Sequence, residues 1–164
     1  MELSEIELVK RIGNIMLEEG ITLSAAESCT GGMVGMLLTS LPGSSAWFIG
    51  SVTAYSNTLK TTILNIPSSL IEEEGAVSRE TALAMAAGIR KLTGSDISIS
   101  VTGIAGPDGG SSEKPVGTVW MAVCSSQSVS AEMKRFQGGR DVVRRKAADY
   151  LLAKLCGLLE KEVK

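Results

Sequence analysis

The feature that most constrains the fold is the alternation of short β-forming segments with longer segments of helical periodicity. Apolar residues recur at helical spacing over residues 3–18, 33–41, 79–92 and 141–159. Segments rich in β-forming residues predict strands over residues 22–26, 47–55, 97–101, 118–124 and 129–136. Strands that alternate with helices predict an α/β fold, built as a three-layer α/β/α sandwich. The last two strands follow one another closely and favour a hairpin, so we expect a mixed sheet.

Residues that start and stop helices agree with these ranges. Ser78 precedes the third long helix as a favoured N-cap, and Gly94 follows it where a glycine closes the last turn. Ser56 offers a similar cap to a short helix that contains Lys60. The chain of 164 residues is long enough to bury one core, so we expect a single domain over residues 1–164.

The composition is that of an ordinary globular protein, with 44% apolar and 21% charged residues. A net charge of −2 argues against a nucleic-acid partner, since proteins that bind nucleic acids usually carry a basic excess. The apolar helix over 33–41 is too short to cross a bilayer, and the acidic start of the chain is unlike a signal peptide. We therefore expect a cytoplasmic protein with no membrane partner. The three cysteines, Cys29, Cys124 and Cys156, form no paired motif and predict reduced thiols.

The chain contains no histidine. This excludes a Ser-His-Asp triad, a Cys-His dyad and any zinc site that needs imidazole. Proton transfer would have to come from lysine, tyrosine, cysteine or a carboxylate.

Ser28 is the first candidate for chemistry, because it lies where a short strand meets a helix that opens on two glycines. Its hydroxyl would face the positive end of that helix. The backbone N–H groups of Cys29, Thr30 and Gly31 would then be placed to bind an oxyanion. The segment resembles a nucleophile elbow in its strand-to-helix arrangement, but it lacks the G-x-S-x-G motif. The alternative is that Ser28 is an ordinary helix N-cap.

A serine nucleophile needs a base, and without histidine a lysine is the best candidate. Lys60 lies just beyond a predicted strand, where sites gather in open α/β sheets. Tyr55, at the end of the same strand, could relay a proton or donate one to the leaving group. The alternatives are a solvated helix lysine and a half-buried strand aromatic.

Two further segments suit a phosphate or a ribose. A glycine-rich loop follows the strand over 97–101, starting at Thr102 and Gly103, and it matches neither a Walker loop nor a dinucleotide fingerprint. Arg140 and Arg144 project from one side of the start of the last helix, and their guanidinium forks suit phosphate. The alternatives are a wide turn for the loop and ion pairs with Asp141 or Asp149 for the arginines. Arg145 is expected to point elsewhere and to be solvated.

Five blocks of sequence together resemble one protein family. The blocks are Ala26-Glu27-Ser28-Cys29-Thr30-Gly31-Gly32, Tyr55-Ser56-Asn57, Gly75-Ala76-Val77-Ser78, Thr102-Gly103-Ile104-Ala105-Gly106-Pro107-Asp108-Gly109-Gly110 and Lys114-Pro115-Val116-Gly117-Thr118-Val119. In this order they resemble the CinA C-terminal domain family, over nearly the whole chain. Members of that family include nicotinamide mononucleotide deamidases, which hydrolyse the carboxamide to nicotinic acid mononucleotide and ammonia.

The resemblance implies Ser28 as nucleophile with Lys60 and Tyr55 beside it. It also implies substrate contacts from Thr102, from the glycines after it and from the arginines after Gly138. It implies no metal or other cofactor. Some relatives carry an additional N-terminal nucleotide-processing domain, and this chain resembles the stand-alone members. A symmetric homo-oligomer is the expectation from the frequency of such assemblies.

Two rival hypotheses stay open at this point. The first moves the nucleophile to Cys29, with Glu27 and Lys60 completing a Cys-Lys-carboxylate set. The second is a nucleotide-binding module without turnover, linked to competence or DNA damage, which the acidic charge balance does not favour.

Overall fold

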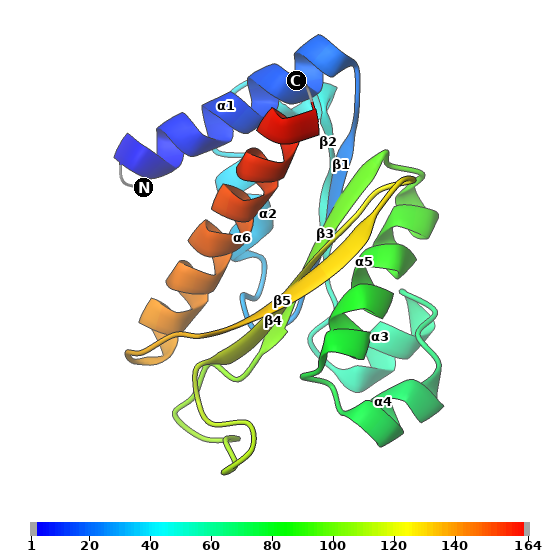
Figure 1. Ribbon diagram of the computed structural model, residues 1–164, viewed down its shortest axis with the longest axis vertical. Coiled ribbons are helices and arrows are strands. Elements are labelled where there is room, and N and C mark those ends of the chain that lie inside the picture. Colours follow the sequence, from blue (N-terminus) through cyan, green and yellow to red (C-terminus); the bar gives the residue numbers. More distant parts are fainter. Residues whose placement is uncertain (1–2, 163–164) are drawn as a thin grey trace.

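A single mixed sheet forms the centre of the computed structural model, which describes residues 3–162 (Figure 1). In the described residues the strand order is β2-β1-β3-β4-β5. The strands are β1 (Leu23–Glu27), β2 (Phe48–Thr53), β3 (Ile97–Gly103), β4 (Thr118–Cys124) and β5 (Val129–Arg135). β1 pairs in parallel with both β2 and β3, whereas β4 is antiparallel to both β3 and β5. This confirms the predicted α/β class, the mixed sheet and the terminal hairpin.

Helices cover both faces of the sheet and complete the three predicted layers (Figure 1). The helices are α1 (Leu3–Glu19), α2 (Met33–Leu38), α3 (Asn57–Thr62), α4 (Ser68–Glu74), α5 (Arg79–Thr93) and α6 (Arg140–Glu162), with a short 3₁₀ turn at η1 (Ser44–Ala46). α1, α2 and α6 lie against one face, and α5 lies against the other together with α3 and α4. None of the described helices is both long and apolar enough to cross a membrane.

The helix ends follow from specific side chains. Ser78 caps α5 by accepting from the N–H of Thr81, and Gly94 ends it in the left-handed conformation at φ 70°. α2 is shorter than predicted and stops at Leu38 rather than at residue 41. The hydroxyl groups of Thr39 and Ser40 donate to carbonyls of its last turn and so compete with further helical hydrogen bonds. α4 was not predicted, because among its residues only Ile71 is buried and no apolar periodicity marks it.

The topology brings the carboxyl ends of β1, β2 and β3 to one edge of the sheet. α2 connects β1 to β2 on one face, while α5 precedes β3 on the other face. Strands whose connections leave toward opposite faces open a crevice beyond their carboxyl ends, where α/β proteins bind ligands. Every residue of β1 is buried, so the residues that follow it start from a rigid support.

Candidate active site

Ser28 and Lys60 meet at this edge of the sheet, although 32 positions separate them in the sequence. Ser28 follows β1 directly, and its own N–H donates to the carbonyl of Val101 on the neighbouring strand β3 at 3.0 Å. Lys60 belongs to α3, which Ser56 caps by accepting from the N–H of Leu59. The Nζ atom of Lys60 lies 3.1 Å from the Oγ atom of Ser28. The predicted serine and lysine are therefore in direct contact.

The surroundings of Lys60 favour an uncharged amine. Its side chain is 1% exposed, and burial lowers the pKa of Lys60 from its usual 10.5. Its Nζ atom also donates to the carbonyl oxygens of Ala54 and Tyr55, at 2.9 and 3.2 Å. A neutral amine has two N–H groups and one lone pair. The charged amine donates to Ser28 Oγ as well as to the two carbonyls. In the neutral amine the two N–H groups serve the carbonyls, and the lone pair can accept the proton of the Ser28 hydroxyl.

A cavity of about 280 Å³ opens in front of this pair. Its lining includes the following predicted site residues: Ser28, Tyr55, Lys60, Thr102, Gly103 and Arg140. Residues of the loop after β3 and of the segment before α5, together with Cys29 and Asn57, complete the wall. Thr30, Gly31 and Arg144 do not line the cavity, so the structure divides the predicted substrate-binding residues into two groups.

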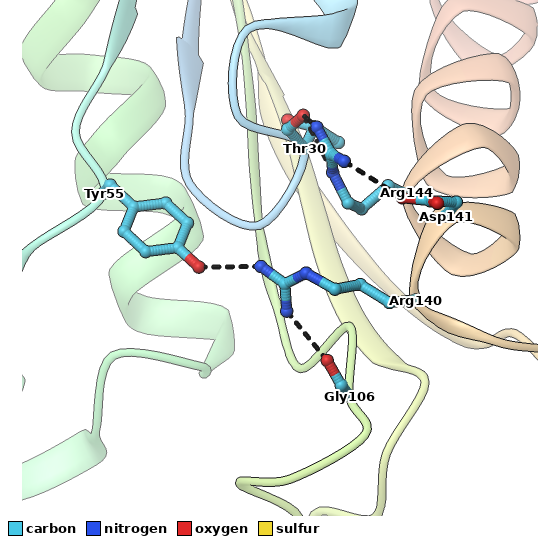
Figure 2. Close-up of polar contacts among 6 residues, drawn as sticks. All are labelled: Thr30, Tyr55, Gly106, Arg140, Asp141 and Arg144. Carbon is cyan, nitrogen blue, oxygen red and sulfur yellow. Dashed lines mark hydrogen bonds and ion pairs between the residues drawn. The ribbon is translucent and has the colours of Figure 1, made fainter.

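Arg140 and Tyr55 form a bridge at the cavity wall (Figure 2). Arg140 lies at the start of α6 and donates to the hydroxyl of Tyr55 at 2.9 Å and to the carbonyl of Gly106 at 2.8 Å. Tyr55 is 57% exposed, which makes it more open than the half-buried aromatic of the alternative hypothesis. Because its oxygen accepts from Arg140, the phenolic proton of Tyr55 remains available to donate toward the cavity.

Arg144 has a different position from the one expected for a phosphate-binding residue. Its guanidinium donates twice to the carbonyl of Thr30, from Nε at 3.3 Å and from Nη2 at 3.0 Å (Figure 2). It also pairs with Asp141 at 3.2 Å, as the alternative for the arginines stated. Arg145 is not merely solvated, because it pairs with Glu5 of α1 at 3.0 Å. The spacing of the arginines in the sequence predicts which side of α6 each one occupies, but it does not predict the partner of each guanidinium group.

The amides after Ser28 are only partly free for an oxyanion. The N–H of Gly31 donates to the carbonyl of Ser28 at 3.1 Å and is used within the turn, contrary to expectation. The N–H group of Cys29 remains as the candidate donor, because Cys29 lines the cavity whereas Thr30 is 0% exposed and does not. Ser28 is also not the N-cap of α2, because that position belongs to Gly32 in the left-handed conformation. Ser28 therefore lies in a tight turn that precedes α2, rather than at the start of a helix.

Glu27 occupies the helix end at which Ser28 was expected to point. Its carboxylate accepts from the N–H groups of Gly32, Val34 and Gly35 and from the hydroxyl of Thr30. Sequence reasoning considered Glu27 only as part of the cysteine hypothesis. A signal for its capping role was present, since an acidic residue near two glycines and a helix start suits unpaired helix N–H groups.

Cys29 also lines the cavity, but its thiol is poorly suited to replace Ser28. The thiol belongs to the apolar core formed with α2 and α6, and the residue is buried. Burial, with a smaller contribution from the charge of Glu27, raises the pKa of Cys29 to about 12. The carboxylate of Glu27 is bound to α2 and completes no Cys-Lys-carboxylate set. The geometry therefore favours the serine over the cysteine.

Thr102 and Gly103 shape the wall of the cavity rather than reach into it. The hydroxyl of Thr102 donates to the carbonyl of Ala76 at 2.7 Å and ties β3 to the segment before α5. A Cβ atom on Gly103 would lie 2.7 Å from Cγ2 of Val119, so a side chain there would displace β4. Among residues 3–162, no group of three Cys, Asp or Glu side chains is arranged to hold a metal ion.

Comparisons with known proteins place this chain in a family. A family model described as the CinA C-terminal domain matches residues 5–159. The chain belongs to the CinA C-terminal domain family. A CinA-like protein of Geotalea uraniireducens is 51% identical over 156 residues, which are 93% of this chain and 37% of that protein. The chain thus spans about a third of the length of the curated relatives that it resembles.

Solved structures of the family share the whole fold. The competence damage-inducible protein A from Klebsiella pneumoniae has a TM-score of 0.92 and 33% identity, over 95% of this chain and 97% of that one. The competence/damage inducible protein CihA from Agrobacterium tumefaciens has a TM-score of 0.92 and 37% identity, over 96% and 99%. The predicted membership of the CinA family is confirmed.

Proposed function

We propose that this CinA C-terminal domain hydrolyses the carboxamide of nicotinamide mononucleotide, giving nicotinic acid mononucleotide and ammonia. The observation that carries the proposal is the 3.1 Å contact between a buried lysine amine and the hydroxyl of Ser28 at a cavity wall. A module that only binds nucleotides has no need of a desolvated amine beside a serine. Such an amine is the arrangement that activates a serine in the absence of histidine.

The mechanism begins with proton transfer from Ser28 to the neutral amine of Lys60. The oxygen of Ser28 attacks the carboxamide carbon, and the N–H group of Cys29 stabilises the oxyanion. Collapse of this tetrahedral intermediate breaks the carbon–nitrogen bond. The ammonium group of Lys60 returns its proton to the departing nitrogen, which leaves as ammonia, and Tyr55 is the second candidate for this donation.

The acyl-enzyme is then hydrolysed by the same groups in reverse. Lys60 takes a proton from water, and the resulting hydroxide attacks the ester carbon. When the carbon–oxygen bond to Ser28 breaks, Lys60 returns the proton to the serine oxygen. The nicotinic acid product leaves as a carboxylate, and its proton passes to solvent.

Recognition of the nucleotide rests in this proposal on Arg140. Its guanidinium lines the cavity and presents a fixed cation to a dianionic phosphate. Arg144 is no longer proposed as a phosphate ligand, because Thr30 and Asp141 occupy its guanidinium. A single domain, a cytoplasmic location and a homo-oligomeric state belong to the same proposal.

The test is a substrate panel with the purified protein. We expect ammonia from nicotinamide mononucleotide, and much less from nicotinamide riboside and free nicotinamide, both of which lack the phosphate. A protein that binds the mononucleotide but releases no ammonia would instead support the non-catalytic binding module.

A further inference from the structure

Glu27 is the one carboxylate in the described chain that is both fully buried, at 0% exposure, and adjacent to the proposed nucleophile. No ion pair within residues 3–162 includes it. Burying a charge is costly unless hydrogen bonds compensate, and an ordinary N-cap needs only a serine or a threonine. A buried carboxylate at this position therefore calls for an explanation beyond capping a helix of six residues.

Four donors surround the carboxylate. Oε2 accepts from the hydroxyl of Thr30 at 2.6 Å and from the N–H groups of Gly32 and Val34, both at 3.0 Å. Oε1 accepts from the N–H of Gly35 at 2.8 Å. Glu27 is itself the last residue of β1, so these bonds join the end of β1 to the first turn of α2. The intervening turn, residues 28–32, is held at both ends.

Gly35 makes the close approach of α2 possible. A Cβ atom at this position would overlap the Oγ atom of Ser51 on β2. With a glycine there, α2 lies close enough to the sheet for its N–H groups to reach the carboxylate of Glu27. The hydrogen bonds between α2 and Glu27 therefore depend both on a glycine at residue 35 and on the length of the Glu27 side chain.

Thr30 is fixed from two sides by opposite charges. Its hydroxyl donates to Glu27, and its carbonyl accepts from Nε and Nη2 of Arg144 on α6. Thr30 directly follows Cys29, whose N–H group remains for an oxyanion at the cavity wall. Opposed contacts on both sides of Thr30 restrict movement of the neighbouring Cys29 backbone, and an oxyanion hole depends on donors that are fixed before the reaction begins.

We propose that Glu27 is the positioning residue of the catalytic turn, acting through Thr30 and the start of α2 to hold the Cys29 amide toward the reacting carbonyl. This inference rests on the proposed amidase function. Glu27 touches no substrate and transfers no proton. Its carboxylate sets the geometry in which Ser28 reacts, and Arg144 completes the same restraint from α6.

The test compares Glu27→Gln with the parent in ammonia release from nicotinamide mononucleotide. A glutamine keeps the volume, but its NH2 group must face one of four donors, so the turn shifts. Because the oxyanion forms only in the transition state, we expect kcat to fall about 100-fold while KM changes little. The pKa of the acidic limb of the pH–rate profile should stay in place, since Lys60 remains the base. Thr30→Ser should retain activity and Thr30→Val should lose it.

Ser24→Ala is the matched control for lost stability. It removes a buried hydrogen bond to Ser95 at 2.7 Å, at the other end of the same strand and away from the turn. Its thermal stability should fall, and its kcat should stay near the parent value. If Glu27→Gln keeps kcat within about twofold of the parent, or loses kcat only in proportion to folded protein as Ser24→Ala does, the positioning role is refuted.

A second readout separates this inference from the function on which it rests. If the parent releases no ammonia from the mononucleotide, the amidase proposal fails, and the labelling of Ser28 by a fluorophosphonate then tests the positioning role by mass spectrometry. We expect Ser28 of the parent to be labelled, and Glu27→Gln to be labelled at least about tenfold more slowly. Equal labelling rates, or a parent Ser28 that is not labelled, would overturn the proposal.

Discussion

Replacing Lys60 by methionine removes the proposed base while keeping a long apolar stem in the same space. General-base catalysis by a positioned side chain contributes roughly 10²–10⁴-fold, so kcat should fall by about that factor. Lys60→Arg should not restore the rate, because a guanidinium does not release its proton. In the parent, the rate should fall at pH values below the pKa of Lys60, which burial places under the usual 10.5.

The pH dependence of the free energy of unfolding gives an independent test of the lowered pKa of Lys60. The folded protein disfavours the charged form of Lys60, so between its lowered pKa and 10.5 the unfolded chain binds more protons. In that window Lys60 makes the parent more stable as pH rises, by about 1.4 kcal/mol per pH unit. Lys60→Met lacks this dependence. It also leaves the buried carbonyl of Ala54 without its donor, which costs about 1–3 kcal/mol at every pH.

The assay is urea unfolding of both proteins at several pH values between 7 and 10.5, together with the pH–rate profile of the parent. Other titrating groups are common to both proteins and cancel in the difference. We expect Lys60→Met to become less stable relative to the parent as pH rises. A difference in unfolding free energy that does not change with pH, or a Lys60→Arg variant within about tenfold of the parent kcat, would refute the neutral-base account.

Two further predictions follow from the arginines and the cysteine. Arg140→Ala should raise KM for the mononucleotide by about ten- to a hundredfold and leave the riboside unchanged, whereas Arg144→Ala should lower kcat for both substrates because it releases Thr30. Steady-state kinetics on both substrates separate these outcomes, and equal selectivity in Arg140→Ala would place phosphate recognition elsewhere. Cys29→Ala should keep most of the activity, and the thiol of the folded parent should resist alkylation at neutral pH because its pKa is raised to about 12.

The sequence predicts the layers of this fold well, because hydrophobic periodicity and turn residues are local signals. It also predicts Ser28, Lys60 and Tyr55 as site residues, since a chain without histidine offers few other choices for a base, and the structure places all three at one cavity. The partners of individual side chains are not local. Arg140 and Arg144 lie one helical turn apart, yet one meets Tyr55 and the other the carbonyl of Thr30.

Glu27 is a second example of a side chain whose partners the sequence does not predict. Its place before two glycines and a helix start suggests a cap, but nothing in the sequence predicts that its side chain is buried, and charged residues are seldom fully buried. Its role depends on how closely α2 approaches the sheet at Gly35, which only the packed structure reveals.

The most direct test of the central claim is a search for the acyl-enzyme. The protein is mixed with nicotinamide mononucleotide, quenched with acid within the first turnovers, digested and analysed by mass spectrometry. The account predicts a nicotinic acid mononucleotide ester on the peptide that contains Ser28, localised to the serine, and no such ester in Ser28→Ala. An ester on Cys29, or ammonia release by Ser28→Ala at the parent rate, would contradict it.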